Sequence, residues 1–211
     1  MLGSNDAIVS TSALMIGVAS ADASTNAILI AGVAGLVGGA MSMAVGEYVS
    51  VSSQSDIEEA DIAIEKAELA GEPGAELAEL TSIYMKRGLD RELAEKVAQA
   101  LTAKDALQAH LRDELGIEPH SRARPLQAAA ASALSFAAFA LVPLLAGLAA
   151  PAAFRPHAIA AVSLASLAGL GAAGAQLGGA PKLRAALRVT VGGALAMGLT
   201  ALIGKLFGVS V

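Results

Sequence analysis

The sequence predicts an all-α membrane protein in which five transmembrane helices carry an acidic helical domain, inserted between helices 2 and 3. The chain of 211 residues is 55% hydrophobic with a mean hydropathy of +0.62, and 16% of its residues are charged. A soluble domain usually has about 25% charged residues. Of the 19 acids, 16 lie between Asp56 and Glu118. The chain therefore joins an apolar part to one acidic, water-facing part.

Five apolar segments account for the membrane part, and a helix needs about 20 mostly apolar residues to cross a bilayer. The last four segments meet that length. The first is short unless its helix begins near Leu2, which would place Asn5 and Asp6 in its opening turns. The segments are residues 7–21, 27–49, 126–150, 157–179 and 183–208. The expected domains are residues 1–50 with helices 1 and 2, residues 51–120 with the acidic domain, and residues 121–211 with helices 3–5.

The apolar segments are rich in Gly and Ala, with the patterns Gly35-x-x-x-Gly39 and Gly174-x-x-x-Gly178. Small residues let helix backbones approach closely in a membrane, so we expect these helices to pack on one another. An Ala-rich composition alone would also produce such patterns.

The basic residues predict the orientation of the chain. If residues 50–125 are cytosolic, twelve of the 14 Lys and Arg lie inside, and only Arg155 and Lys205 lie outside. Basic residues concentrate on the cytoplasmic side of membrane proteins. The N-terminus and the acidic domain are therefore expected in the cytosol and the C-terminus outside. The start "MLGSNDAIVS" has no Lys or Arg ahead of its apolar run, unlike a cleaved signal peptide.

The acidic domain is predicted to form three or four short helices, the first continuing from the second span, because Glu, Ala, Leu and Lys dominate it. Breaks are expected at Gly71–Gly74 and at Gly88, and Asp90 is placed to cap the helix that follows. Gly116 and Pro119 should end the last helix.

Two carboxylate pairs, Glu65-x-x-Glu68 and Glu76-x-x-Glu79, flank the first break. Residues three apart share a helix face, so helices folded back at this break would bring four carboxylates together. Such a group repels itself unless it is protonated or bridged by cations, and divalent cations accept oxygen ligands. The domain is therefore predicted to bind metal. The alternative is a solvated acidic face.

His110 and Glu114 lie four residues apart in the last predicted helix, again on one face. An imidazole and a carboxylate at this spacing can share a metal ion. A surface salt bridge is the alternative interpretation.

Ionisable and thioether side chains of the first two spans are candidates for an ion pathway. Asp6 opens the first span and Glu47 closes the second, and ionisable side chains in a membrane are functional candidates; both could instead be interfacial. Met41 and Met43 would add soft thioether ligands that favour transition metals, although methionine usually fills space in a core.

Composition also excludes classes of function. The chain has no Cys, which excludes disulfides and thiolate metal sites. Its net charge of -5 argues against nucleic acid as a partner, because phosphates require a basic surface.

The strings "GSNDAIVSTSALMIGVA" and "AGLVGGAMSMAVGEYVSVSSQSD" resemble the first two spans of the vacuolar iron transporter family, and the likeness extends through the acidic domain into three more spans. The resemblance implies five transmembrane helices, a homodimer with the ion path between protomers, and movement of Fe²⁺, Mn²⁺ and other divalent ions out of the cytosol, with protons as counter-ions.

The resemblance also assigns residues. The family's membrane Asp and Met fall on Asp6 and Met43, and its cytosolic metal-binding glutamates fall on Glu65, Glu68, Glu76, Glu79 and Glu114. Two positions depart from the pattern. His110 and Leu111 stand where plant-type members have two methionines, and Gly35 stands where they have a second membrane carboxylate.

The predicted function is therefore transport of divalent transition-metal ions, Fe²⁺ or Mn²⁺, Co²⁺ and Zn²⁺, out of the cytosol by proton antiport. No enzymatic activity and no prosthetic group are expected, and the expected location is a bacterial inner membrane. A membrane-tethered metal buffer or sensor without conduction is the alternative. A ferroxidase is disfavoured because the usual Glu-x-x-His spacing of di-iron bundles is absent, and a purely structural membrane protein is the third possibility.

Overall fold

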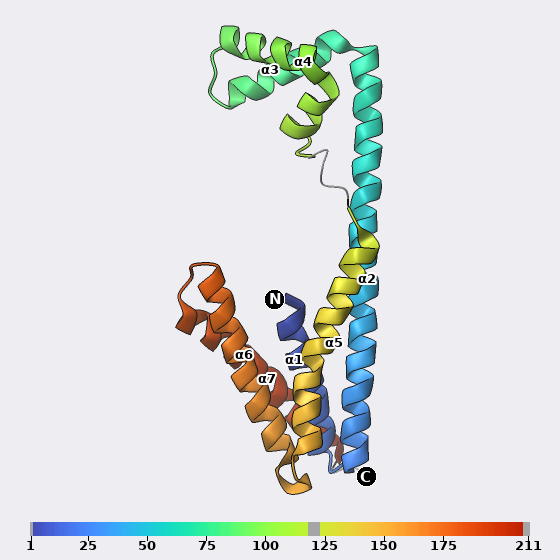
Figure 1. Ribbon diagram of the computed structural model, residues 1–211, viewed down its shortest axis with the longest axis vertical. Coiled ribbons are helices and arrows are strands. Elements are labelled where there is room, and N and C mark those ends of the chain that lie inside the picture. Colours follow the sequence, from blue (N-terminus) through green and yellow to red (C-terminus); the bar gives the residue numbers. More distant parts are fainter. Residues whose placement is uncertain (1, 118–122, 209–211) are drawn as a thin grey trace. The chain divides into compact units, whose positions relative to one another are not determined.

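The computed structural model describes residues 2–117 and 123–208, and over these ranges the chain forms helices joined by turns, without a strand (Figure 1). The elements are α1 (Leu2–Ser20), α2 (Thr25–Gly71), α3 (Pro73–Lys86), α4 (Arg91–Asp113), α5 (Pro125–Ala149), the 3₁₀ turn η1 (Ala152–Phe154), α6 (Arg155–Leu177) and α7 (Lys182–Gly208). They divide into two compact units. The membrane unit is Met1–Tyr48 with Leu126–Val211, and the acidic unit is Val49–Pro125.

Within the described residues, four segments are long and apolar enough to cross a membrane. They are α2, α5, η1 with α6, and α7. The fifth predicted span, α1, is not among them. Its helix begins at Leu2 and so contains Asn5 and Asp6 in its opening turns, and these polar side chains interrupt its apolar stretch. The structure therefore supports four of the five predicted spans by length and composition.

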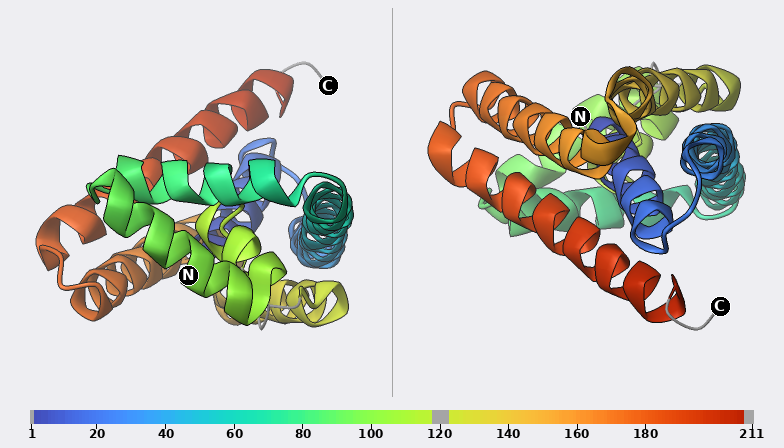
Figure 2. Two further views of the ribbon diagram at one scale, coloured as in Figure 1. Left: turned by 90° about the horizontal axis from the view of Figure 1, so that it is seen from above. Right: turned by 90° about the horizontal axis from the view of Figure 1, so that it is seen from below.

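The core of the membrane unit forms where α1 packs against α6 and α7, which also pack on each other. The view from below in Figure 2 shows α1 lying against both helices. Met15 and Ile16 of α1 are buried there in one cluster with Ile159 and Met197. Gly204 of α7 lies directly on the backbone of Gly17, leaving no room for a Cβ. Close packing through small residues is thus observed, although Gly178 caps α6 instead of forming such a contact.

The acidic unit is held together by α3 and α4, which pack through a small core of Leu80, Ala98 and Ala109. The predicted breaks at Gly71–Gly74 and at Gly88 and the predicted cap at Asp90 are confirmed. α2 ends at Gly71, Gly88 adopts φ +102°, and the Asp90 carboxylate caps α4 by accepting a hydrogen bond from the Leu93 N–H at 2.9 Å.

Two features at the end of α4 refine the sequence analysis. The helix ends at Asp113, and Gly116 follows with φ +69°, whereas Pro119 lies outside the described residues. α4 also bends at Asp105, whose φ of -167° and ψ of 95° are not helical. The Asp105 carboxylate accepts a hydrogen bond from the Gln108 N–H at 3.0 Å. Asp105 therefore acts as an internal N-cap for the last two turns of the helix.

Candidate metal centre

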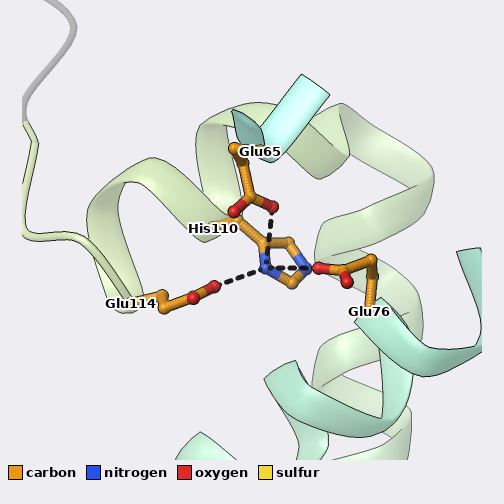
Figure 3. A group of neighbouring side chains, drawn as sticks. All are labelled: Glu65, Glu76, His110 and Glu114. Carbon is orange, nitrogen blue, oxygen red and sulfur yellow. Dashed lines mark hydrogen bonds and ion pairs between the residues drawn. The ribbon is translucent and has the colours of Figure 1, made fainter. Parts of the chain in front are cut away.

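Four side chains with metal-ligand chemistry meet inside the acidic unit (Figure 3). Glu65 comes from α2, Glu76 from the first turn of α3, His110 from α4, and Glu114 from the residue that caps α4. Each offers one ligand atom, and these atoms all lie within 4.8 Å of one another. We call this group the four-ligand centre.

The imidazole of His110 lies at the middle of the centre. Its Nδ1 is 2.9 Å from Glu114 Oε2, 3.2 Å from Glu65 Oε1 and 3.7 Å from Glu76 Oε2. One ring nitrogen can donate a single hydrogen bond. Only the Glu114 contact has hydrogen-bond geometry, and the buried Glu65 Oε1 and His110 Nε2 have no hydrogen-bond partner among the described residues. Since unpaired buried polar atoms are costly, the protein alone does not satisfy this group.

Two carboxylates of the centre, those of Glu65 and Glu76, lie in an environment that disfavours negative charge. Glu65 is 2% exposed and Glu76 is 8% exposed. Burial is the main cause that raises the pKa of Glu65, opposed by His110 and reinforced by Glu114, Glu76 and Glu68. Burial likewise raises the pKa of Glu76, again opposed by His110 and reinforced by neighbouring glutamates. A bound cation would relieve both the repulsion and the desolvation.

The donor set decides which cations fit. Carboxylate oxygens with one imidazole suit Fe²⁺, Mn²⁺, Co²⁺ and Zn²⁺, and the chain has no thiolate to select softer ions. A ligand must lose its proton before it binds a metal ion, so protons and metal ions compete for these carboxylates.

Glu68 and Glu79, the other members of the two predicted pairs, are not part of the four-ligand centre. Both are exposed on their helices. Their charges still act on the centre, since Glu68 raises the pKa of Glu65 and Glu79 raises the pKa of Glu76. Of each i,i+3 pair, one carboxylate therefore points inward and the other lies at the rim.

Asp113 is a residue that the sequence analysis missed. A hydrogen bond from Arg112 is the first cause that holds the pKa of Asp113 well below its usual range, and Tyr84 and Arg87 lower it further. Tyr84 belongs to α3 and Arg87 is the residue that caps this helix, and they lie 29 and 26 positions from Asp113 in sequence. Local sequence patterns do not reveal a contact across such a separation.

The membrane unit contains a separate pocket of about 220 Å³ beside Asp6 and Met43. The remaining lining residues are Ser10, Leu14, Gly35, Gly39, Ser42 and Phe136. Asp6 is exposed and makes no ion pair with a described residue. The structure thus places two of the predicted pathway residues around one space, which we call the Asp6 pocket.

Glu47, another predicted pathway residue, does not line the Asp6 pocket. It is exposed on α2, one helical turn beyond Met43. Gly35 does line the pocket, and a Cβ at this position would come within 3.0 Å of Leu14 Cδ2.

Comparison with known proteins gives extended matches. Residues 1–205 match the model of the VIT family. A protein of Acanthamoeba castellanii named "Vacuolar iron transporter" is 50% identical over 207 residues, which cover 98% of this chain and 76% of the relative. "Vacuolar iron transporter homolog 1" of Oryza sativa subsp. japonica is 40% identical over 208 residues, which cover 99% of this chain and 72% of the relative.

Proposed function

This chain belongs to the VIT family, and from that premise we propose that it carries Fe²⁺ and related divalent ions out of the cytosol in exchange for protons. Members of the family are metal-ion transporters and not enzymes. The four long apolar helices and this membership make the chain an integral membrane protein. The observation that carries the proposal is the four-ligand centre, in which Glu65, Glu76 and His110 are buried and Glu114 is exposed.

The acidic unit is proposed to collect the ion. Glu65, Glu76, His110 and Glu114 bind it, while the exposed Glu68 and Glu79 raise the local cation concentration at the rim. Mn²⁺, Co²⁺ and Zn²⁺ suit the same donors as Fe²⁺.

The membrane unit is proposed to pass the ion through the Asp6 pocket, with α1 as a fifth span. Asp6 supplies a carboxylate and Met43 a thioether, and Glu47 lies one turn further along α2. Because a carboxylate exchanges its proton for the metal ion, the same side chain can couple the two flows.

A homodimer is proposed because one chain supplies too few ligands at the Asp6 pocket. One carboxylate and one thioether line it, besides the hydroxyls of Ser10 and Ser42, whereas transition-metal ions take about four to six donors. A second copy would double the set.

The proposed orientation follows the distribution of basic residues, with the N-terminus and the acidic unit in the cytosol and the C-terminus outside. The names of the amoebal and rice relatives refer to a vacuole, whereas the expectation for this sequence is a bacterial inner membrane. In either membrane, the ion would leave the cytosol.

The proposal is tested by Fe²⁺ uptake into sealed proteoliposomes that enclose a pH-sensitive dye, with and without an imposed pH gradient. We expect metal entry coupled to proton exit. Fe²⁺ bound to the protein without entry would reject transport and leave a membrane-tethered buffer. That second function is favoured by one observation, since the four-ligand centre lies entirely within the acidic unit.

A further inference from the structure

The last part of α4 carries two of the four ligands on a separate piece of helix. After the bend at Asp105, the chain regains helical geometry and places His110 on the final turns and Glu114 at the cap. We call residues 106–114 the ligand segment. Because the bend interrupts α4, the direction of the preceding helix does not by itself fix the direction of this segment.

The ligand segment is held at its start by the Asp105 cap, in which Oδ1 accepts from the Gln108 N–H at 3.0 Å. Ala109 and Leu111 are buried and pack its apolar side. A helix of two turns has little stability of its own, so such contacts determine its position.

At the other end, Asp113 ties the segment to the end of α3. The Tyr84 hydroxyl donates to Asp113 Oδ2 at 2.6 Å, and Arg87 Nη1 donates to Oδ1 at 2.8 Å. Arg87 Nη2 also donates to the Asp113 backbone carbonyl at 2.9 Å, which satisfies a helix-terminal acceptor. The Arg87 guanidinium lies 5.3 Å from the centre of the Tyr84 ring. We call Tyr84, Arg87 and Asp113 the Asp113 clamp.

The clamp acts next to the four-ligand centre. Asp113 is adjacent to Glu114 and less than one helical turn from His110, and its side chain is 7% exposed. Both of its oxygens accept hydrogen bonds from Tyr84, Arg87 or Arg112. The Asp113 carboxylate therefore holds the end of α4 in place, and it is not one of the ligands of the four-ligand centre.

The centre has a physical need for such a clamp. Without a cation, the carboxylates of Glu65, Glu76 and Glu114 crowd one imidazole and repel one another. Repulsion of this kind moves the ligand segment away from α2 and α3 unless another contact opposes it. The clamp supplies that contact through charge-assisted hydrogen bonds, which are stronger than neutral ones.

We propose that Asp113 is a positioning residue, which through Tyr84 and Arg87 holds His110 and Glu114 in the geometry that a divalent cation requires before the ion arrives. This inference rests on the proposed function of the four-ligand centre and adds a specific residue to it. Loss of a partner that orients a metal ligand commonly weakens metal affinity by about 10- to 100-fold.

The test uses the full chain in detergent, titrated with Co²⁺ and followed by visible absorption, which reports coordination geometry. Asp113→Asn should weaken Co²⁺ affinity by about tenfold and alter the spectrum. Tyr84→Phe removes one hydrogen bond without changing charge, and it should act in the same direction with a smaller effect. This second variant keeps the test decisive if Asp113→Asn does not fold.

The matched control is Asp90→Ala at the opposite end of α4. Asp90 is also a helix-terminal aspartate, and it accepts one hydrogen bond, from the Leu93 N–H. Its loss should lower the melting temperature while leaving Co²⁺ affinity and the spectrum unchanged. His110→Ala removes one ligand of the four-ligand centre, so the Co²⁺ absorption that this variant loses belongs to that centre.

The proposal is overturned if Asp113→Asn and Tyr84→Phe bind Co²⁺ as the wild type does. It is also overturned if Asp90→Ala loses as much Co²⁺ affinity as Asp113→Asn does for each degree by which the melting temperature falls. Asp113 would then act only by stabilising the fold. A wild-type signal that His110→Ala does not change would reject the four-ligand centre itself, and the positioning role with it.

Discussion

The acidic unit and the membrane unit offer different sets of donor groups to a cation. In the acidic unit, three carboxylates and an imidazole converge to within 4.8 Å. In the membrane unit, the Asp6 pocket offers one carboxylate and one thioether beside two hydroxyls. A nearly complete donor set holds an ion, whereas an incomplete set lets it leave. On the proposed function, the first site would retain the ion and the second would pass it on.

The largest expected effect is a loss of Fe²⁺ flux, caused by a change in the membrane unit. In Asp6→Asn, the pocket loses its carboxylate, so Fe²⁺ flux into proteoliposomes should fall to the level of empty vesicles. Metal binding by the acidic unit should persist. Asp22→Asn is the control, because Asp22 lies outside the pocket and its φ of 55° is tolerated by Asn. Undiminished flux in Asp6→Asn would remove Asp6 from the pathway.

The next largest effect is a loss of metal affinity, caused by a change in the acidic unit. Glu65→Gln removes a buried ligand, and metal affinity should fall by more than the roughly 10- to 100-fold that the loss of an orienting partner costs. The melting temperature of the metal-free protein should rise, because a carboxylate whose pKa is raised by burial disappears. Glu59→Gln, at an exposed position of the same helix, should change neither quantity. Full affinity in Glu65→Gln would show that the acidic unit binds metal elsewhere.

The pH dependence of stability, with and without metal, tests the acidic unit further. The pKa values of Glu65 and Glu76 are raised above 4.5 in the folded chain, so the folded protein binds more protons than the unfolded chain between pH 4.5 and those raised values. The free energy of unfolding of the metal-free protein should therefore fall as pH rises through this window. Metal-induced stabilisation should show the opposite trend and shrink as pH falls, because protons displace the ion. Differential scanning fluorimetry with chelator or Mn²⁺ checks both trends.

Comparison with Glu65→Gln isolates the contribution of the centre from that of the other acids. The pH slope of the metal-free protein should be shallower in this variant than in the wild type. Equal slopes would contradict the raised pKa of Glu65.

The smallest expected effect concerns the shape of the Asp6 pocket. A Cβ at Gly39 would collide with the ring of Phe136, which is 2% exposed, whereas a Cβ at Gly38 would meet no described atom within 4 Å. Gly39→Ala should therefore displace the ring and lower Fe²⁺ flux several-fold. Gly38→Ala adds the same methyl group and should leave flux unchanged. Equal flux in the two variants would show that the position of the Phe136 ring does not affect transport.

Local chemistry in the sequence predicted most of the helix boundaries. A Gly-Pro break, a Gly with positive φ and an Asp cap act within a few residues, so Gly71, Gly88 and Asp90 could be assigned from sequence alone. The bend at Asp105 was not predicted, because a single Asp inside a helical pattern is compatible with a straight helix. Asn5 and Asp6 interrupt the apolar stretch of α1, so the role of α1 as a fifth span stays a proposal.

The site was predictable in its residue types but not in its geometry. Spacing identified the acids of α2 and α3, yet it could not tell the buried Glu65 from the exposed Glu68, because i,i+3 residues share a face equally. The full burial of His110 depends on the packing of α3 against α4. The Asp113 clamp also depends on that packing, since its partners lie 26 and 29 residues away.

The difference between a site that holds ions and a site that passes them is tested most directly by the Fe²⁺ concentration dependence of flux. Wild type, Asp6→Asn and Glu65→Gln would be measured in one series of proteoliposomes. We expect Glu65→Gln to require more Fe²⁺ for half-maximal flux while reaching the wild-type maximum, and Asp6→Asn to show no flux at any concentration. A normal maximum in Asp6→Asn, or no flux in Glu65→Gln at saturating Fe²⁺, would contradict the account.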